Sequence, residues 1–351
     1  MKIGDLGEFG LIDRIARLLP HPPANVVVGI GDDVAVLKTS GTEYLLATCD
    51  IQVEDVHFLR RNTTPHQLGR KVVAVNVSDI AAMGGTPLWA LVSLALPDDT
   101  DVSFVEGLYS GMREQSASAG AAIVGGNLSG SSGKMAIDLF LLGRVLPEHL
   151  MLRSGARDGD LILVTGALGE SRAGLELTRF PNLMVSKESR QRGLQRHLTP
   201  EPRLAEGQVL GRSGKVHAML DVSDGLLGDL GHICRAGGVG AEIWIKDLPV
   251  ASSCREVARA SGQDPVDWAL SGGEDYELLL TAGEASVSEI QSMLREETGI
   301  PCHVIGRVLG GCREIRIVSP EGGESLYALD KLGWDHFKKR RDPLGPAQSD
   351  S

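Results

Sequence analysis

The stretch Ala74-Val75-Asn76-Val77-Ser78-Asp79-Ile80-Ala81-Ala82-Met83-Gly84 places one carboxylate inside an otherwise apolar helical pattern. The pattern predicts a helix that begins at Thr64-Pro65, with proline at the first helical position, and ends at Gly84-Gly85. A buried carboxylate is costly unless it is paired or binds a metal. No basic residue stands within one turn of Asp79, so the stretch favours a metal ligand.

Further acidic residues stand at predicted strand ends, helix starts and loops. Each alone has an ordinary explanation, because Asp-Gly pairs make turns and an aspartate before a helix caps it. Together they predict carboxylates that converge and would repel one another without divalent cations between them. Hard oxygen ligands in that number are typical of Mg²⁺ bound together with substrate phosphates. The acidic residues in question are Asp32, Asp33, Asp50, Asp79, Asp221, Asp224, Glu274 and Asp275.

Two weaker signals point to a phosphate ligand. Gly125-Gly126-Asn127 follows a strand predicted over residues 121–124, and glycines there let backbone N–H groups approach a phosphate. Arg153 lies near the junction of the two halves and, taken alone, is better explained as a surface arginine. The sequence contains no GxxxxGK[ST], no complete GxGxxG after a strand and no HExxH, which argues against an ordinary P-loop, Rossmann or zincin site.

The order of elements predicts a two-domain α+β and α/β protein. Residues 1–147 mix helices and strands with antiparallel hairpins, which predicts an α+β domain built on a mixed sheet. Residues 148–337 alternate strands and helices, which predicts an α/β domain. We interpret the polar, basic stretch 180–197 as a surface excursion and residues 338–351 as a disordered tail.

Composition narrows the class of protein. A length of 351 residues with 42% hydrophobic residues fits about two globular domains. A formal net charge of −11 argues against a nucleic-acid-binding protein, which usually carries a basic face. The apolar runs are far shorter than a membrane span of about 20 residues, and no apolar signal segment is visible. Five cysteines without a CxxC pair fit a reducing compartment, so we expect a cytoplasmic protein without membrane or nucleic-acid partners.

Four motifs resemble the signatures of the thiamine-monophosphate kinase family. They are Gly29-Ile30-Gly31-Asp32-Asp33, the stretch from Ala74 to Gly84, Asp221-Val222-Ser223-Asp224-Gly225-Leu226 and Leu270-Ser271-Gly272-Gly273-Glu274-Asp275-Tyr276-Glu277-Leu278. The family is part of a superfamily that includes aminoimidazole ribonucleotide synthetase, selenophosphate synthetase and a hydrogenase maturation factor. The resemblance runs in order from about Gly7 to Phe337, and the last motif is specific to the kinase branch.

The resemblance implies a fold, a reaction and a set of site residues. The N-terminal domain would dimerise through its sheet, with ATP bound near that interface. The reaction would be ATP-dependent phosphorylation of thiamine monophosphate to thiamine diphosphate by direct in-line transfer, with several Mg²⁺ ions and no side-chain nucleophile or base. The implied metal ligands are Asp33, Thr48, Cys49, Asp50, Asp79, Asn127, Asp221 and Asp224. The implied ATP contacts are Gly126, Asn127, Arg153 and Ser223, and the implied substrate contacts are His57, Glu274 and Trp334.

Two departures from the family pattern leave alternatives open. Asn127 stands where the family has aspartate, which removes a negative charge from one Mg²⁺ site, and Cys49 stands where it has threonine. A catalytically weakened or regulatory member is therefore one alternative. Another ATP-dependent chemistry of the superfamily is the second, although no cysteine precedes Cys49 and the chain ends Gln-Ser-Asp-Ser, which argue against selenophosphate synthetase and the maturation factor.

Overall fold

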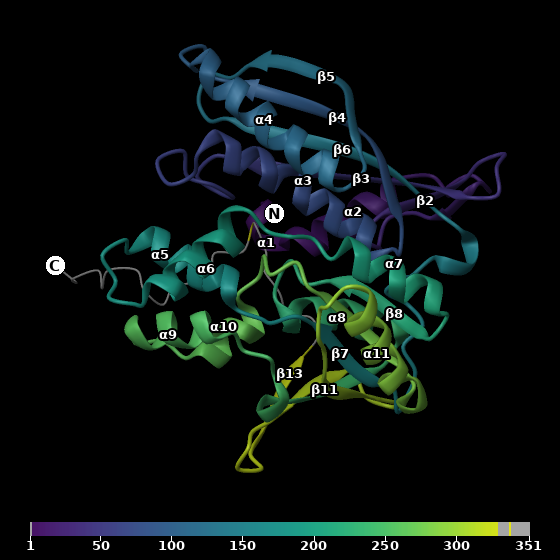
Figure 1. Cartoon of the computed structure of the whole chain (residues 1–351). Helices are drawn as coiled ribbons and strands as arrows, with labels where there is room; N and C mark the ends of the chain where they lie inside the picture. Colours follow the sequence, from purple (N-terminus) through teal and green to yellow (C-terminus); the bar gives the residue numbers. More distant parts are fainter. Residues whose placement is uncertain (1, 329–336, 338–351) are drawn as a thin grey trace.

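The computed structural model describes residues 2–328 and residue 337, and it divides into two halves, each built on its own sheet (Figure 1). The N-terminal half contains a six-stranded sheet of order β1-β2-β3-β6-β4-β5. The C-terminal half contains a seven-stranded sheet of order β13-β12-β9-β11-β7-β10-β8. Both sheets mix parallel and antiparallel neighbours, since β4 pairs in parallel with β5 and β12 with β9, while the other pairs are antiparallel.

The elements of the N-terminal half are α1 (Ile3–Leu6), α2 (Glu8–Leu18), β1 (Val26–Val28), β2 (Ala35–Lys38), β3 (Tyr44–Val53), α3 (Pro65–Ala82), β4 (Thr86–Leu96), α4 (Val102–Ser118), β5 (Ala122–Gly130) and β6 (Ala136–Val145). The short 3₁₀ helix η1 (Pro147–His149) follows.

The elements of the C-terminal half are β7 (Leu161–Thr165), α5 (Glu170–Arg179), α6 (Lys187–Leu198), α7 (Leu204–Ser213), β8 (Val216–Asp221), α8 (Leu226–Gly237), β9 (Gly240–Trp244), η2 (Ile245–Asp247), α9 (Ser252–Ala260), α10 (Pro265–Ser271), β10 (Leu278–Ala282), η3 (Glu284–Ser286), α11 (Val287–Glu297), β11 (Cys302–Leu309), β12 (Glu314–Val318) and β13 (Glu324–Ala328).

Helix α3 forms because its start is capped and most of its length is buried. Thr64 accepts the N–H of Gln67, whose side chain returns to the Thr64 N–H, and Pro65 occupies the first turn. Helices α3 and α4 then cross at contact distance. A Cβ at Gly69 would lie 2.0 Å from the Leu108 carbonyl oxygen, and only glycine allows this approach.

The N-terminal sheet has one covered and one open face. Along β4, Ala90, Val92 and Leu94 are buried in the core shared with α3 and α4, whereas Trp89, Leu91 and Ser93, which alternate with them, are exposed. This alternation is typical of a sheet that packs on one side only. Figure 1 shows α3 and α4 on the side of this sheet that faces the C-terminal half.

The C-terminal sheet is covered on both faces, since every residue of β7 and β10 is buried. The halves meet along α3, which packs against α7 and β8. Side-chain contacts that cross this boundary include Ser78 with Asp221, Lys71 with Glu274, Asn62 Nδ2 with the Thr178 carbonyl oxygen, and Gln208 Nε2 with the Gly85 carbonyl oxygen.

Two details differ from the sequence-based prediction. Strand β5 does not end before Gly125 but continues to Gly130, because residues 125–130 pair in parallel with β4. The stretch 180–197 is not simply a surface excursion, because it contains α6, whose His197 and Leu198 are buried. The predicted disordered tail, 338–351, and Trp334 lie outside the described residues, and the boundary between residues 147 and 148 stays a prediction. Among the described helices, none has the length and apolar character needed to cross a membrane.

Candidate active site

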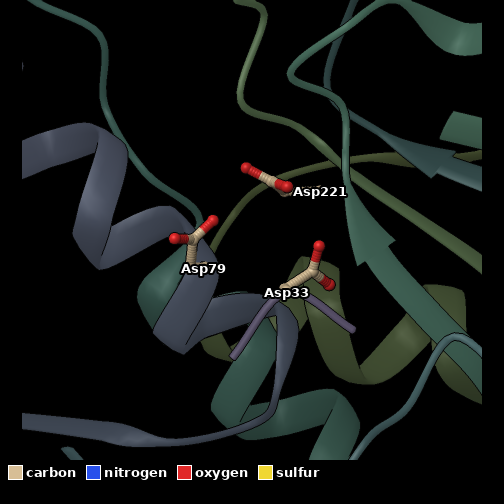
Figure 2. Close-up of side chains that lie close together, drawn as sticks. All are labelled: Asp33, Asp79 and Asp221. Atoms are coloured by element: carbon tan, nitrogen blue, oxygen red, sulfur yellow. The ribbon is translucent and has the colours of Figure 1, made fainter. Parts of the chain in front are cut away.

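Three carboxylates from distant parts of the chain converge between the halves. Asp33 lies just before β2, Asp79 in the last turn of α3 and Asp221 at the end of β8. Each offers a carboxylate oxygen, and these oxygens all lie within 4.8 Å of one another. Figure 2 shows the three side chains pointing into a common space. The predicted convergence of these aspartates is therefore present in the fold.

Hydroxyl and amide groups of α3 and β3 orient these carboxylates. The Thr48 hydroxyl donates to Asp79 Oδ2 at 2.6 Å, and the Ser78 hydroxyl donates to Asp221 Oδ2 at 2.5 Å. Asn76 Oδ1 accepts the backbone N–H of Asp50 at 3.1 Å. Within this Asn-Val-Ser-Asp sequence, Asn76 therefore contacts β3, Ser78 contacts β8, and Asp79 belongs to the carboxylate cluster.

The carboxylates strongly perturb one another. Burial raises the pKa of Asp79 well above its ordinary value, neighbouring aspartates raise it further, and the Thr48 hydroxyl lowers it. Burial and then Asp33 raise the pKa of Asp221 to about 8. Burial and then Asp138 raise the pKa of Asp50 to about 6. Without a bound cation, the raised pKa therefore leaves Asp221 largely protonated at neutral pH, and the cluster does not carry its full negative charge.

The same residues fit a divalent cation. Asp33 Oδ2 is buried without a hydrogen-bond partner, which is costly for a charged oxygen unless a ligand occupies its free side. Carboxylate and hydroxyl oxygens are the hard donors that Mg²⁺ prefers. Arg153 contacts Asp33 through its guanidinium group, and its backbone N–H donates to Asp32 at 3.2 Å. Arg153 is thus part of the site rather than a surface arginine.

Two motifs of the C-terminal half run side by side next to this cluster. The Glu274 N–H donates to the Ser223 carbonyl at 2.7 Å, and the Tyr276 N–H donates to the Val222 carbonyl at 2.9 Å. Glu274 and Tyr276 adopt φ values of 57° and 50°. Non-glycine residues in this region carry strain that concentrates at functional sites. On the other side of the loop, Asp224 donates its N–H to Asp229 at 3.1 Å.

Glu274 is held by two residues that the sequence analysis did not select. Lys71 Nζ lies 2.6 Å from Glu274 Oε1, and His197 Nδ1 lies 3.3 Å from Glu274 Oε2. Burial raises the pKa of Glu274, but Lys71 and His197 outweigh it and hold the pKa below its ordinary value. The signal for Lys71 was present in the sequence, since a lysine interrupts the apolar face of α3. No local pattern indicated His197.

The residues on the open face of the N-terminal sheet do not join the carboxylate cluster within one chain. Asn127 pairs with Ser93, Ser93 with Asp138, and Asp138 with Ile51. Three strand spacings of about 4.8 Å separate Asn127 from β3, or roughly 14 Å. Cys49 is exposed on the same open face, whereas its neighbours Thr48 and Asp50 belong to the covered face.

Two further predicted site residues, Gly126 and His57, have local structural roles. A Cβ at Gly126 would lie 1.9 Å from the Val92 carbonyl oxygen, so packing against β4 already requires glycine there. His57 follows β3, and its Nδ1 accepts the Val53 N–H at 3.0 Å, which leaves the proton on Nε2.

Comparison with known proteins places this geometry in a family. The model of AIR synthase related protein, N-terminal domain, matches residues 31–145, and that of the C-terminal domain matches residues 157–319. Thiamine-monophosphate kinase of Aquifex aeolicus is 37% identical over 345 residues, covering 96% of this chain and 100% of that protein. The chain belongs to the thiamine-monophosphate kinase family. The enzyme of that name from Bacillus subtilis is 34% identical over 338 residues, with 95% and 100% coverage.

A solved structure supports the assignment to the thiamine-monophosphate kinase family. AaThiL complexed with AMPPCP and TMP matches with a TM-score of 0.81 and 36% identity, covering 96% of this chain and 99% of that chain. The predicted two-domain architecture of α+β and α/β elements is confirmed by the two family models and this structure. The resemblance inferred from the four motifs is likewise confirmed.

Proposed function

We propose that this protein transfers the γ-phosphoryl group of ATP to thiamine monophosphate and so produces thiamine diphosphate and ADP. The observation that carries the proposal is the set of close carboxylates Asp33, Asp79 and Asp221, which joins motifs of both halves in a site suited to Mg²⁺. Curated thiamine-monophosphate kinases resemble the chain over nearly its whole length. The AaThiL structure contains AMPPCP and TMP, which supports ATP and thiamine monophosphate as the substrates.

The residues of the cluster would position two polyanions for in-line transfer. When bound, Mg²⁺ screens the repulsion between ATP and the acceptor phosphate. Asp33, Asp79 and Asp221 would hold the metal together with Thr48, whose hydroxyl also orients Asp79, while Ser78 orients Asp221. The remaining proposed ligands are Cys49, Asp50, Asn127 and Asp224. The attacking phosphate oxygen is already anionic, so no side chain has to remove a proton. Positioning of the two substrates then supplies most of the rate enhancement.

We assign the two substrates to opposite sides of the Asp221–Asp224 loop. Arg153 and Ser223, together with Gly126 and Asn127, would contact ATP. Glu274, His57 and Trp334 would contact the thiamine substrate, and an indole stacked on a cationic thiazolium is a favourable pair. The role of Trp334 rests on the family resemblance alone.

We further propose a homodimer formed through the open face of the N-terminal sheet. Ile51, Trp89 and Leu91 are 51%, 49% and 42% exposed on this face, and a contiguous exposed apolar patch commonly marks an interface. Within one chain, Asn127 lies three strand spacings from β3, which carries Cys49. A two-fold dimer formed across this face would bring Asn127 of a second copy toward Cys49. We place the protein in the cytoplasm, since its five cysteines are free thiols.

The proposal is tested by coupled ADP release from the purified chain with ATP and Mg²⁺. Release should require thiamine monophosphate, stop on chelation of Mg²⁺, and remain at the acceptor-free background with free thiamine. A folded chain that binds ATP but releases no ADP with any acceptor would support the regulatory alternative that Asn127 leaves open. ADP release independent of thiamine monophosphate would point to another chemistry of the superfamily.

A further inference from the structure

Lys71 is a buried cation for which the proposed reaction has no direct use. Its side chain is 2% exposed, and it belongs to the buried side of α3 together with Leu68 and Val72. A buried ammonium is costly unless a matched anion compensates it. Lys71 therefore occupies a position that hydrophobic residues could fill at lower cost, and its charge needs an explanation.

The partner of Lys71 is the carboxylate assigned to the thiamine substrate. Lys71 Nζ contacts one oxygen of Glu274 at 2.6 Å, and His197 contacts the other at 3.3 Å. The Glu274 side chain remains 29% exposed. A carboxylate has about four acceptor positions, so these two contacts fix its plane and leave lone pairs directed toward the open side.

The backbone of Glu274 increases the need for such a support. Its φ of 57° lies in the left-handed region, which is unfavourable for a side chain longer than Asn or Asp. Its N–H is held by Ser223 in the loop beside the carboxylate cluster. The orientation of the side chain is thus set from two directions, by the Ser223 loop at the backbone and by Lys71 at the carboxylate.

Helix α3 links this contact to the metal end of the site. Lys71 and Ser78 are seven residues apart and so lie on the same side of the helix, and Ser78 donates to Asp221 at 2.5 Å. Eight residues separate Lys71 from Asp79, or roughly 12 Å along the axis. One rigid element therefore carries both the residue that holds Glu274 and a carboxylate of the cluster.

We propose that Lys71 is a positioning residue for thiamine monophosphate binding, which acts by holding the Glu274 carboxylate in the orientation that receives the substrate. This inference rests on the proposed function and on the assignment of Glu274 to the substrate. His197 completes the support from α6, because its ring also lies 3.2 Å from Ser171 Oγ and is fixed there.

The test measures KM for thiamine monophosphate and for ATP separately, together with the melting temperature, in Lys71→Met, Lys71→Arg, Glu274→Gln and the double variant Lys71→Met/Glu274→Gln. Lys71→Met should raise KM for thiamine monophosphate about tenfold or more and leave KM for ATP within about twofold. Lys71→Arg, which keeps the charge but not the geometry, should raise it less and retain the melting temperature. If Lys71→Met does not fold, an unchanged KM for thiamine monophosphate in Lys71→Arg overturns the proposal.

The double variant separates positioning from an independent contact. Because Lys71 acts through Glu274, the double variant should raise KM for thiamine monophosphate no more than the larger single change. Multiplicative effects would show that Lys71 acts on its own. The matched control is Asn62→Ala, which removes another contact between the halves and should leave both KM values unchanged.

The outcomes distinguish a failure of this inference from a failure of the proposed function. Turnover by the wild-type protein with no KM effect in Glu274→Gln would remove Glu274 from the substrate site, and the role of Lys71 with it, while the kinase activity stands. An effect in Glu274→Gln without one in a folded Lys71→Met would overturn the role of Lys71 alone. A purely structural Lys71 would lower the melting temperature and leave both KM values unchanged.

Discussion

Asp79 stands beside the carboxylates of Asp33 and Asp221, and within residues 2–328 the side-chain donor that contacts it is the Thr48 hydroxyl. Removing that charge relieves repulsion in the metal-free protein but removes a ligand from the loaded one. Activity and stability should therefore respond in opposite directions at this residue.

Asp79→Asn should lower kcat/KM roughly 100-fold or more, since a metal ligand contributes several kcal/mol to stabilising charge in the transition state. In EDTA its melting temperature should equal or exceed that of the wild type. Asp99→Asn, a change on an exposed loop, is the control and should alter neither quantity. Wild-type turnover by Asp79→Asn at limiting Mg²⁺ would show that the cluster does not hold the metal.

The metal-free protein should lose stability as the pH rises. The pKa of Asp221 is raised from 3.8 to about 8, so between these values the folded state holds a proton that the unfolded state has released. The free energy of unfolding then falls by about 1.4 kcal/mol per pH unit for one such group. Thermal melts in EDTA between about pH 5 and 8 should show this fall, and Asp221→Asn should reduce it. A slope that is the same in both proteins would contradict the assignment.

At the scale of elements, the segment from Gly273 to Glu277 joins several helices to the C-terminal sheet. Asp275 accepts the N–H groups of Gly169 at 2.7 Å and Ser171 at 3.2 Å, which caps the start of α5. Glu277 is fully buried, and Arg196 and Arg203 each donate to it at 2.6 Å. The carboxylates of this motif thus anchor α5, α6 and the start of α7, while Glu274 faces α3.

Asp275→Ala should lower the free energy of unfolding by about 1–3 kcal/mol, because a helix cap is lost and buried N–H donors are left unpaired. Asp264→Ala, which removes the exposed cap of α10, should cost less, about 0.5–1 kcal/mol. Urea unfolding of the two variants gives the comparison. An equal or smaller loss for Asp275→Ala would argue against its role as a buried cap.

Local sequence patterns predicted the elements for which the pattern of burial and the capping residues indicate the same boundaries. The apolar run with Thr64 and Pro65 predicted α3 to within a residue, and aspartates at strand ends predicted the cluster. Strand β5 was predicted too short because its glycines pair with β4, a contact that no local signal reveals. Helix α6 was missed because its polar sequence is stabilised by tertiary partners. One of them is Glu170, which accepts hydrogen bonds from Arg192 and Arg196. The role of Lys71 could not be predicted, because its partner Glu274 is distant in the sequence and lies against it only in the folded protein.

At the scale of the whole molecule, the two sheets lie on either side of α3 (Figure 1), and the outer face of the first exposes Ile51, Trp89 and Leu91. Helices cover its inner face. The face that carries Asn127 and Cys49 is the one left open, so the proposed dimer and the proposed nucleotide contacts belong to the same surface.

Leu91→Glu should convert the proposed dimer into a monomer, since it places a charge in the centre of the apolar face. Light scattering after size exclusion measures the mass directly. Met184→Glu changes a residue that is 89% exposed in the C-terminal half and should leave the mass unchanged. A wild-type protein that is monomeric at micromolar concentration, or a Leu91→Glu variant that stays dimeric, would remove this interface.

In the proposed reaction, one phosphoryl group passes from ATP to thiamine monophosphate without an intermediate on the protein. A label on the γ-phosphate of ATP can be followed in a reaction with Mg²⁺ and thiamine monophosphate. We expect the label in the terminal phosphate of thiamine diphosphate, one for each ADP formed, and no accumulation of labelled protein. Label found only in inorganic phosphate, or bound covalently to the protein during turnover, would contradict it.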